Sequence, residues 1–248
     1  MRVTRLCDEV SLTEVSLIDK TEFLHTASKD GAFSIVTALI GAQANVNHVS
    51  ATSNLESPLY LAATEGHIII VNKLIEARAN VNHVTYDNFY SPILRASEKG
   101  HIDTVRALVT AKANVNQRTK DLVFAPLYCA SNFGHTDIVR VLVAAKANVN
   151  VHSDDGANPI ILASQKGHVD IVRDLIGAQA NVNHATANLY TPLHLASENG
   201  HVDIVNVLIN ARANVDQLNG NSDTPILRAC VNTHIDVVRV LIDAKANV

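Results

Sequence analysis

Apolar residues recur along the chain at the spacing of short helices. Within residues 202–210, valine, isoleucine and leucine stand three and four positions apart, so their side chains share one side of a helix. Similar stripes recur in other segments of the chain. A single stripe has nothing to pack against within its own segment. The pattern therefore predicts short helices that bury their apolar sides against neighbouring copies.

A shorter helix is predicted before each apolar stripe. Thr191 offers an N-cap oxygen, and Pro192 stands at the first helical position, where no N–H is needed. Gly200 ends this helix, because a left-handed C-terminal position favours glycine. Capping oxygens recur at Ser57, Ser91, Asn158 and Thr224, whereas Ala125 lacks one. An aspartate suited to the helix dipole begins most second helices, at Asp103, Asp137, Asp170, Asp203 and Asp236.

Three markers repeat in phase at intervals of 33 to 35 residues: a proline, a Gly-His pair and Ala-Asn-Val-Asn. A period of this length indicates a stack of units rather than one globular core. The first Asn of the last marker lies at Asn45, Asn80, Asn114, Asn148, Asn181, Asn214 and Asn247. The predicted repeats span residues 19–47, 48–82, 83–116, 117–150, 151–183, 184–216 and 217–248. Residues 1–18 are predicted to form an N-terminal segment or half-repeat cap.

The markers resemble a known family. Thr-Pro-Leu-His-Leu-Ala, Gly-His-Val-Asp-Ile-Val and Ala-Asn-Val-Asn are similar to the ankyrin repeat, and the resemblance covers residues 19–248. It implies an all-α solenoid of antiparallel helix pairs joined by β-hairpin or finger loops. It also implies a curved array that binds other macromolecules, without catalysis.

The chain departs from the family pattern in several places. Where the family usually has glycine after the second helix, this chain has Gln43, Arg78, Lys112, Lys146, Gln179, Arg212 and Lys245. A non-glycine residue at positive φ costs about 1 kcal/mol, so we expect strain or a differently closed turn. Polar Glu22 and Thr26 suit an end repeat that faces water. The connections at 50–56, 85–90 and 119–124 are longer than the tight turn at 154–156 and are expected to bulge.

Composition narrows the function classes. The net charge of -4 argues against a dedicated nucleic-acid binder, and no apolar run approaches the roughly 20 residues needed for membrane insertion. No catalytic or nucleotide-binding motif is present, so neither an enzyme nor a cofactor is predicted. Three scattered cysteines give no disulfide framework, Cys129 and Cys230 being too far apart to pair. These features favour a cytoplasmic protein.

The histidines favour structural roles over metal binding. Those of the Gly-His marker stand a full repeat apart, whereas zinc ligands lie about 2 Å from one ion. They are His67, His101, His135, His168, His201 and, after Thr233, His234. We therefore expect hydrogen bonding there. At the start of the first helices, His25 and His194 are expected to bond to the neighbouring loop.

Aromatic residues locate the candidate surface. Five of the ten lie in the connections between helix pairs, where a core of small aliphatic residues does not need them. The candidate partner-binding residues, on the expected concave face, are Tyr86, Phe89, Tyr90, Arg95, Phe124, Asn132, Phe133 and Tyr190. Arg95 and Arg228 replace a leucine and should reach that face or pair with an acidic neighbour. For Tyr90 and Tyr190, packing of finger against finger explains the rings as well as binding does, whereas Tyr86 and Phe89 favour binding.

The leading hypothesis is a non-catalytic module that binds a protein partner, whose identity the sequence does not give. The alternative is a regulatory or targeting segment of a larger enzyme or channel. The resemblance also implies a third hypothesis, hydroxylation of the hairpin asparagines Asn47, Asn82, Asn116, Asn150 and Asn183. The helix at 235–242 is as apolar as internal ones, which predicts self-association or fraying of the last repeat.

Overall fold

The computed structural model describes residues 17–49, 54–121 and 123–247. The chain divides into two compact units, Met1–Asp121 and Leu122–Val248. Within the described residues every regular element is a helix and there is no strand. Most of the predicted N-terminal segment, together with Cys7 and residues 50–53 of one connection, lies outside the described residues. The repeat boundaries given above stay a prediction.

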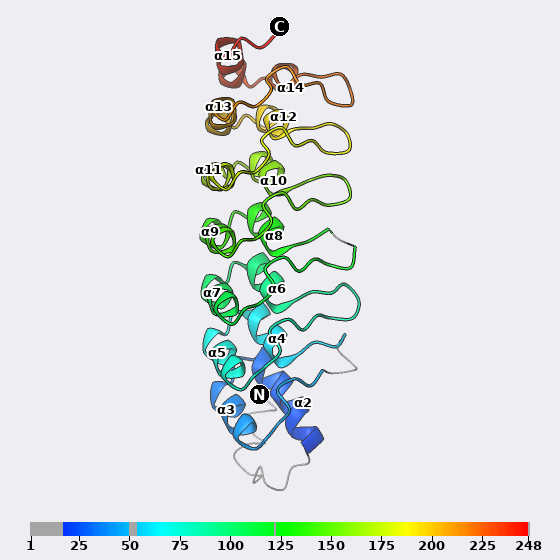
Figure 1. Ribbon diagram of the computed structural model, residues 1–248, viewed down its shortest axis with the longest axis vertical. Helices are drawn as coiled ribbons and strands as arrows, with labels where there is room; N and C mark the ends of the chain where they lie inside the picture. The colour runs from blue at the N-terminus through cyan, green and yellow to red at the C-terminus, as the bar shows by residue number, and fades with distance from the viewer. Residues whose placement is uncertain (1–16, 50–53, 122, 248) are drawn as a thin grey trace. The chain divides into compact units, whose positions relative to one another are not determined.

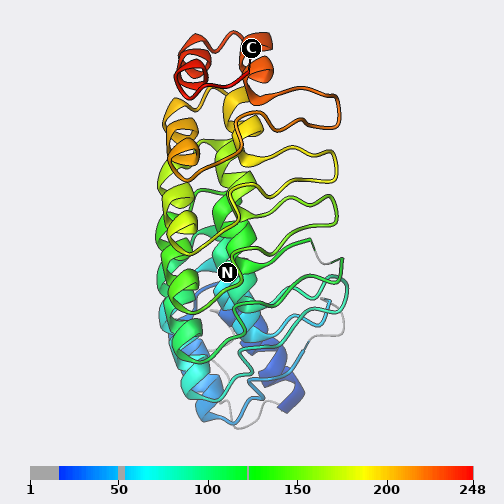
Figure 2. The ribbon, with the colours of Figure 1, turned by 45° about the horizontal axis from the view of Figure 1, so that its top comes forward.

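Among its described residues, the first unit contains three helix pairs. They are α2 (Leu17–Lys29) with α3 (Phe33–Gly41), α4 (Pro58–Glu65) with α5 (Ile68–Glu76), and α6 (Pro92–Lys99) with α7 (Ile102–Thr110). The even-numbered helices pack on one another, as do the odd-numbered ones, which gives two layers (Figure 1). The connections between pairs extend away from the even-numbered layer (Figure 2).

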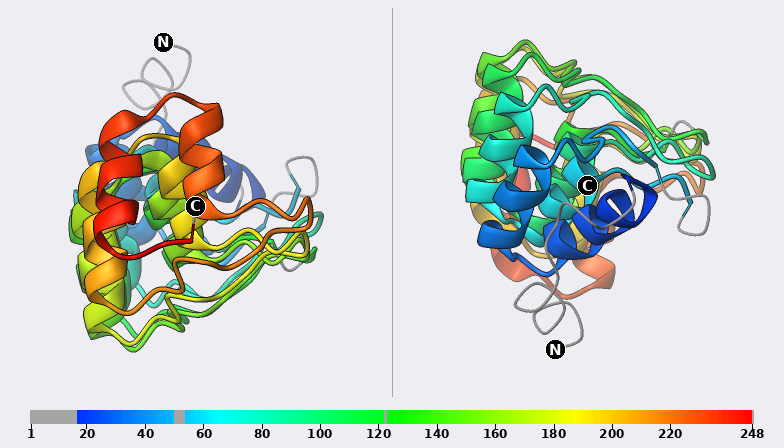
Figure 3. Two further views of the ribbon diagram at one scale, coloured as in Figure 1. Left: turned by 90° about the horizontal axis from the view of Figure 1, so that it is seen from above. Right: turned by 90° about the horizontal axis from the view of Figure 1, so that it is seen from below.

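Among its described residues, the second unit contains four helix pairs, which likewise form two layers. They are α8 (Pro126–Asn132) with α9 (Thr136–Ala144), α10 (Pro159–Lys166) with α11 (Val169–Gly177), α12 (Pro192–Glu198) with α13 (Val202–Asn210), and α14 (Pro225–Val231) with α15 (Ile235–Asp243). Successive helices of each layer are in contact. Seen from above, the loop before α14 lies on the side away from α15 (Figure 3). The predicted all-α array of helix pairs is thus confirmed in each unit.

The predicted helix ends are confirmed. Ser57 Oγ accepts the N–H of Tyr60 at 3.2 Å, and the equivalent residues Ser91, Asn158, Thr191 and Thr224 also cap their helices. Ala125 gives no side-chain cap. The glycine of the Gly-His marker takes a left-handed conformation, with φ of 76° at Gly66 and 74° at Gly200. Glu22 and Thr26 are exposed on α2, as expected of an end repeat.

The histidines of the Gly-His marker, and His234 at the equivalent position after Thr233, join successive repeats. Nε2 of His234 donates to the carbonyl of Glu198 at 2.9 Å, and His67, His101 and His201 make the same bond to the preceding repeat. The His234 ring also lies against Gly200, where an added Cβ would stand 2.6 Å from Nδ1. Glycine is therefore needed both for its φ and for the close approach of the ring. This confirms the structural role expected for these histidines.

The residues that replace the family glycine accept the left-handed conformation. Gln179 has φ of 66°, and the other six residues at this position have φ between 62° and 66°. The N–H of Gln179 bonds to the carbonyl of Ile176 at 2.9 Å, which closes the helix end in the usual way. Of the two expectations, strain is therefore the one confirmed.

The asparagines of Ala-Asn-Val-Asn also link neighbouring repeats. Asn183 Oδ1 accepts the backbone N–H of Asn214 at 2.8 Å, and Asn47, Asn82 and Asn150 repeat this contact. Between the last two repeats Asp216 takes the place of asparagine. Its carboxylate accepts hydrogen bonds from the backbone N–H and from the side-chain amide of Asn247. These bonds explain why the marker returns in every repeat.

Replacing Asn183 by alanine is expected to lower the free energy of unfolding by about 1 kcal/mol, the net contribution of one such hydrogen bond. Urea denaturation followed by circular dichroism measures the change. Asn206, exposed on α13, provides the control, because alanine at a helical surface position should be neutral or slightly stabilising. Equal effects at the two positions would contradict a role for the asparagine ladder.

Candidate functional site

The finger face of the second unit is formed by three loops and the even-numbered helices beside them. The loops are residues 152–158, 185–191 and 217–224, and the helices are α8, α10, α12 and α14 (Figures 1 and 3). We call the loops fingers. In the first finger the backbone N–H of Ser153 donates to the carbonyl of Ala157 at 2.9 Å. In the second, the N–H of Thr186 donates to the carbonyl of Tyr190 at the same distance, so each bond closes its finger.

Backbone bonds also hold adjacent fingers side by side. The N–H of Ala187 donates to the carbonyl of Asp155 at 2.7 Å, and the N–H of Gly220 donates to the carbonyl of Asn188 at 2.8 Å. A finger of one repeat is thus fixed against the finger of the next. Side chains from different repeats can therefore form one continuous surface.

A cavity of about 380 Å³ opens on this face between the fingers and α8, α10 and α12. Its lining combines two tyrosine rings, aliphatic side chains and two carboxylates. The residues that carry the argument below are Tyr128, Tyr190, Leu162, Leu195, Asp155 and Glu198. Tyr190 alone among the sequence candidates lines this cavity.

The other lining residues were missed for identifiable reasons. Tyr128 occupies a first-helix position that pattern analysis assigns to the core, and the structure does bury most of its ring. Asp155 has the signature of a tight turn. Glu198 could have been found from the sequence. It stands two residues before a glycine, as does Asn132, which was a candidate.

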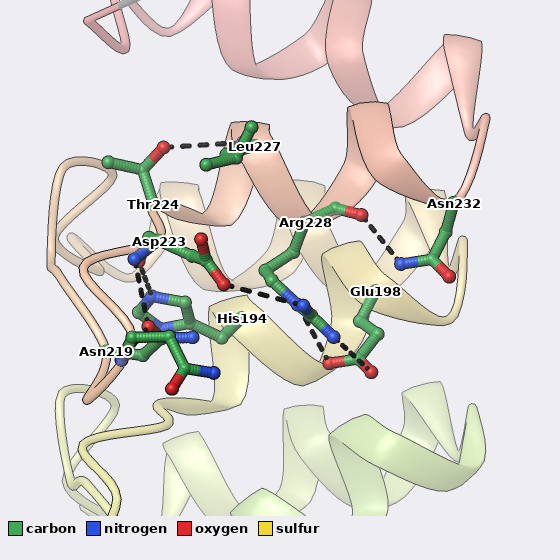
Figure 4. A network of polar contacts seen from close by, with 9 residues as sticks. His194, Glu198, Asn219, Asp223, Thr224, Leu227, Arg228 and Asn232 are labelled. Atoms are coloured by element: carbon green, nitrogen blue, oxygen red, sulfur yellow. Dashed lines mark hydrogen bonds and ion pairs between the residues drawn. The ribbon is translucent and has the colours of Figure 1, made fainter.

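Arg228 joins two repeats beside this cavity. Its Nη2 lies 2.7 Å from Glu198 Oε1, its Nη1 lies 3.5 Å from Asp223 Oδ2, and its guanidinium carbon lies 5.8 Å from the Tyr190 ring centre. Figure 4 shows the contacts of Arg228 with Glu198 on α12 and with Asp223 in the loop before α14. The bond to Glu198 raises the pKa of Arg228. The expected pairing of Arg228 with acidic neighbours is confirmed.

A related cluster lies in the first unit. Arg95 Nη1 lies 2.7 Å from Glu98 Oε2, and its guanidinium carbon lies 5.2 Å from the centre of the Tyr90 ring. Burial raises the pKa of the neighbouring Tyr60 to about 12, because the charged phenolate would lose its hydration. The expected acidic partner of Arg95 is thus confirmed. For Tyr90 and Tyr190 alike, packing under an arginine is a structural contact that leaves binding as a prediction.

The longest described finger in the first unit carries two exposed candidates, and one of them, Tyr86, is the most exposed of all. Tyr86 is 72% exposed and Phe89 is 39% exposed, with Lys120 Nζ 6.0 Å from the Phe89 ring centre. The backbone of Tyr86 bonds to the carbonyl of Asn54 in the neighbouring connection at 3.2 Å. Phe89 itself has φ of 57°, in the left-handed region. Both rings are positioned by the backbone and are open to a partner.

The remaining candidates lie elsewhere in the second unit. The half-buried Phe124 meets Tyr128 edge to face at 5.8 Å, which is the packing alternative for that ring. Phe133 is exposed and stacks on His135 at 6.3 Å, while Asn132 is half-buried at the end of α8. Neither Asn132 nor Phe133 lines the cavity. A patch that joins Arg95 to Phe133 would draw on both compact units, and it stays a prediction.

His194 forms a buried hydrogen-bonded link to the next finger. Its Nε2 donates to the carbonyl of Asp223 at 3.1 Å, and its Nδ1 accepts the N–H of Thr191 at 3.2 Å. His25 bonds in the same way to Glu56 at 3.0 Å. The expected bonding of both histidines to the neighbouring loop is confirmed. Burial lowers the pKa of His194, because the charged form would lose its hydration.

This lowered pKa predicts a loss of stability in acid. Below pH about 6.5 the unfolded chain takes up a proton that folded His194 resists, so stability falls as the pH drops through that value. Above it the contribution is complete. The fall in melting temperature between neutral and mildly acidic buffer should be larger for the natural chain than for His194→Gln. An equal fall in both would show that His194 does not carry the effect.

Other chemistry finds little support among the described residues. In that part of the chain no group of three histidine, cysteine or acidic residues could hold a metal ion. No described helix is long and apolar enough to cross a membrane. Cys129 is buried and Cys230 exposed, and both are free thiols.

The chain is similar to known repeat proteins over nearly all of its length. A family model described as ankyrin repeats in three copies matches residues 24–119, 93–186 and 161–248. The crystal structure of the human ASB11 ankyrin repeat domain matches with a TM-score of 0.79 and 26% sequence identity. That match covers 91% of this chain and 98% of the other. Comparison with curated proteins gave no match.

Proposed function

Because the chain belongs to the ankyrin repeat family, whose repeats are generally protein–protein interaction modules, we propose that it binds a protein partner on its finger faces and performs no catalysis. The finger face of the first unit is formed by the finger at 85–91 and the even-numbered helices. The proposed contact residues are the sequence candidates, exposed Leu189 on a finger of the second unit, and the cavity in that unit.

Strained apolar fingertips carry this proposal. Phe89 and Leu189 hold φ of 57° and 60°, at the finger position where another repeat has Gly156. A left-handed conformation costs a residue with a Cβ about 1 kcal/mol or more. Leu189 nevertheless remains 48% exposed, so burial on folding recovers only part of that cost. Contact with a partner would recover the rest, and strained residues of this kind cluster at binding sites.

Serine substitutions at Tyr86, Phe89 and Leu189 test the proposal. If these side chains are central contacts, the triple variant should bind the partner at least about thirty-fold more weakly, with unchanged circular dichroism and melting. Proteins captured from the source cell by the two forms would be compared by mass spectrometry. Serine at Asn206 and Arg239, exposed on the odd-numbered layer, gives the matched control. Undiminished capture by the triple variant would refute the proposal, and loss of folding would show that the rings are structural.

Phe124 is tested in a separate variant, because its ring packs against Tyr128. Serine at Phe124 should weaken binding without unfolding if the ring serves a partner. A drop in melting temperature would instead assign it to packing.

The proposed location is the cytoplasm, where an exposed free thiol such as Cys230 is kept reduced. Fractionation of the source cell tests this. The alternative hypothesis, a regulatory or targeting segment of a larger protein, predicts the same binding surface. It differs in the length of the expressed protein, which an immunoblot measures.

A second proposal concerns the last helix pair, whose outer apolar face we propose to associate with a second copy of the chain. Leu227 is 44% and Val231 65% exposed on α14, whereas His194, which corresponds to Leu227 one repeat earlier, is fully buried. The first described helix, α2, presents polar Glu22 and Thr26, so it is a poor match for an apolar face. Two copies therefore fit tail to tail, in the self-complementary manner of a two-fold dimer.

Light scattering on the purified chain tests this association. The mass should rise to that of a dimer with concentration, and glutamate at Leu227 and Val231 should keep it monomeric with unchanged helicity. A natural chain that stays monomeric at its highest soluble concentration would contradict the proposal.

A further inference from the structure

The cavity on the finger face of the second unit has the size of a ligand site. Its volume of about 380 Å³ falls within the range of roughly 300–1,000 Å³ typical of pockets for small ligands. Leu162 and Leu195 provide apolar contact, while the rings of Tyr128 and Tyr190 supply aromatic walls. This combination suits a long side chain with an apolar stem and a polar end.

The charges that line the cavity indicate which polar group a bound side chain should carry at its end. The described residues that line the cavity include the carboxylates Asp155 and Glu198 but no lysine, arginine or histidine. Beside them lies the cation Arg228, which is shared between Glu198 and Asp223. The group therefore holds three carboxylates against one guanidinium. A positively charged side chain bound in the cavity would balance this excess of negative charge.

Asp155 is prepared for such a side chain. Its Oδ1 accepts the Ser153 hydroxyl and, at 3.1 Å, the N–H of Ala157, so the carboxylate is held in place within the finger. These bonds lower its pKa, which keeps it ionised in mild acid. Every hydrogen bond described for this side chain ends on Oδ1. Oδ2 keeps its capacity to accept.

Arg228 illustrates the binding mode. Its guanidinium lies over the Tyr190 ring while it pairs with Glu198, which combines a cation–π contact with a charge-assisted hydrogen bond. Building on the proposed protein-binding function, we infer that the cavity receives an arginine side chain from an extended segment of the partner. The guanidinium pairs with Asp155 and Glu198, and its stem packs against the tyrosine rings. Arginine fits this site better than lysine, because a planar guanidinium both stacks and binds carboxylates in pairs.

Nuclear magnetic resonance titration of the whole chain with N-acetyl-arginine amide tests the inference. Saturable shift changes should centre on the cavity residues, and N-acetyl-leucine amide and N-acetyl-glutamate amide should bind at least about five-fold more weakly. Asp155→Asn keeps the Oδ1 acceptor but removes the charge, so it should fold normally and weaken the arginine probe about five-fold. Asp154→Asn makes the same change of charge one residue away, outside the cavity lining, and should leave the affinity unchanged.

Arg228 provides a test with the opposite sign. Arg228→Gln removes the chain's own competitor for Glu198, so it should strengthen binding of the arginine probe several-fold. Circular dichroism verifies that the variant is folded. If Arg228 only stabilises the repeat interface, its removal will not improve binding.

Three results would overturn the inference: equal binding of the arginine and leucine probes, equal effects of the two aspartate variants, or shift changes away from the cavity. Its failure is distinguishable from that of the proposed function. If partner capture depends on the fingertips but the arginine probe does not bind, only the inference about the cavity is refuted. Arginine binding without any fingertip-dependent capture would refute the proposed function and leave the chemistry of the cavity intact.

Discussion

Replacing Leu175 by alanine is expected to lower the free energy of unfolding by about 3 kcal/mol, because a large-to-small change in a packed core loses buried apolar area and leaves a cavity. Leu175 is fully buried in α11, which contacts α9, α10 and α13. The change therefore weakens the interfaces with both neighbouring repeats. Urea denaturation followed by circular dichroism measures it.

Leu241 gives the matched comparison. It is also fully buried, but its helix α15 packs chiefly against two described helices, α13 and α14, where α11 packs against three. Since each repeat is stabilised by its neighbours, alanine at Leu241 should loosen the last repeat first and cost less in the main unfolding transition. Equal losses at the two leucines would mean that the helix pairs unfold as one indivisible unit, contrary to nearest-neighbour stacking.

Replacing Gly200 by alanine is expected to destabilise the chain by about 2 kcal/mol, the sum of a left-handed residue with a Cβ and a displaced histidine hydrogen bond. The new Cβ would stand 2.6 Å from His234 Nδ1. The ring would have to move, and with it the 2.9 Å bond from Nε2 to the carbonyl of Glu198. Melting temperature and urea midpoint both report the effect.

Gly177 is the control of opposite sign. It ends α11, and an added Cβ there meets nothing within 4 Å. Alanine should therefore stabilise the helix by about 0.5 kcal/mol. If both glycine variants shift stability in the same direction, the account of the Gly-His contact is wrong.

The sequence predicted the repeated framework well because its signals are local. Proline with a capping oxygen marks where a helix begins, and Gly66 or Gly200 marks where one ends, whatever the neighbouring repeat contains. The partner of each histidine was expected in general terms, and the structure adds which carbonyl accepts it. For the residues that replace the family glycine, the sequence left two conformations open, and only the backbone decides between them.

The binding surface was predicted only in part because it depends on contacts between repeats. Tyr128 has the sequence signature of a core residue, yet its edge lines the cavity once α8 packs on α10. Asp155 faces the cavity because its finger is bonded to Ala187, roughly one repeat away. Arg228 was expected to find an acidic partner, but Glu198 is in the preceding repeat. No sequence pattern within one repeat specifies these contacts between residues of different repeats.

The central claim is that a protein partner contacts the fingers and not the odd-numbered helices. Site-specific photo-crosslinking tests it most directly, with a benzophenone amino acid at Leu189 on a fingertip and, in a second variant, at exposed Asn206 on α13. Irradiation in the source cell should yield a discrete protein adduct from position 189 and none from position 206. An adduct from position 206 alone would contradict the account.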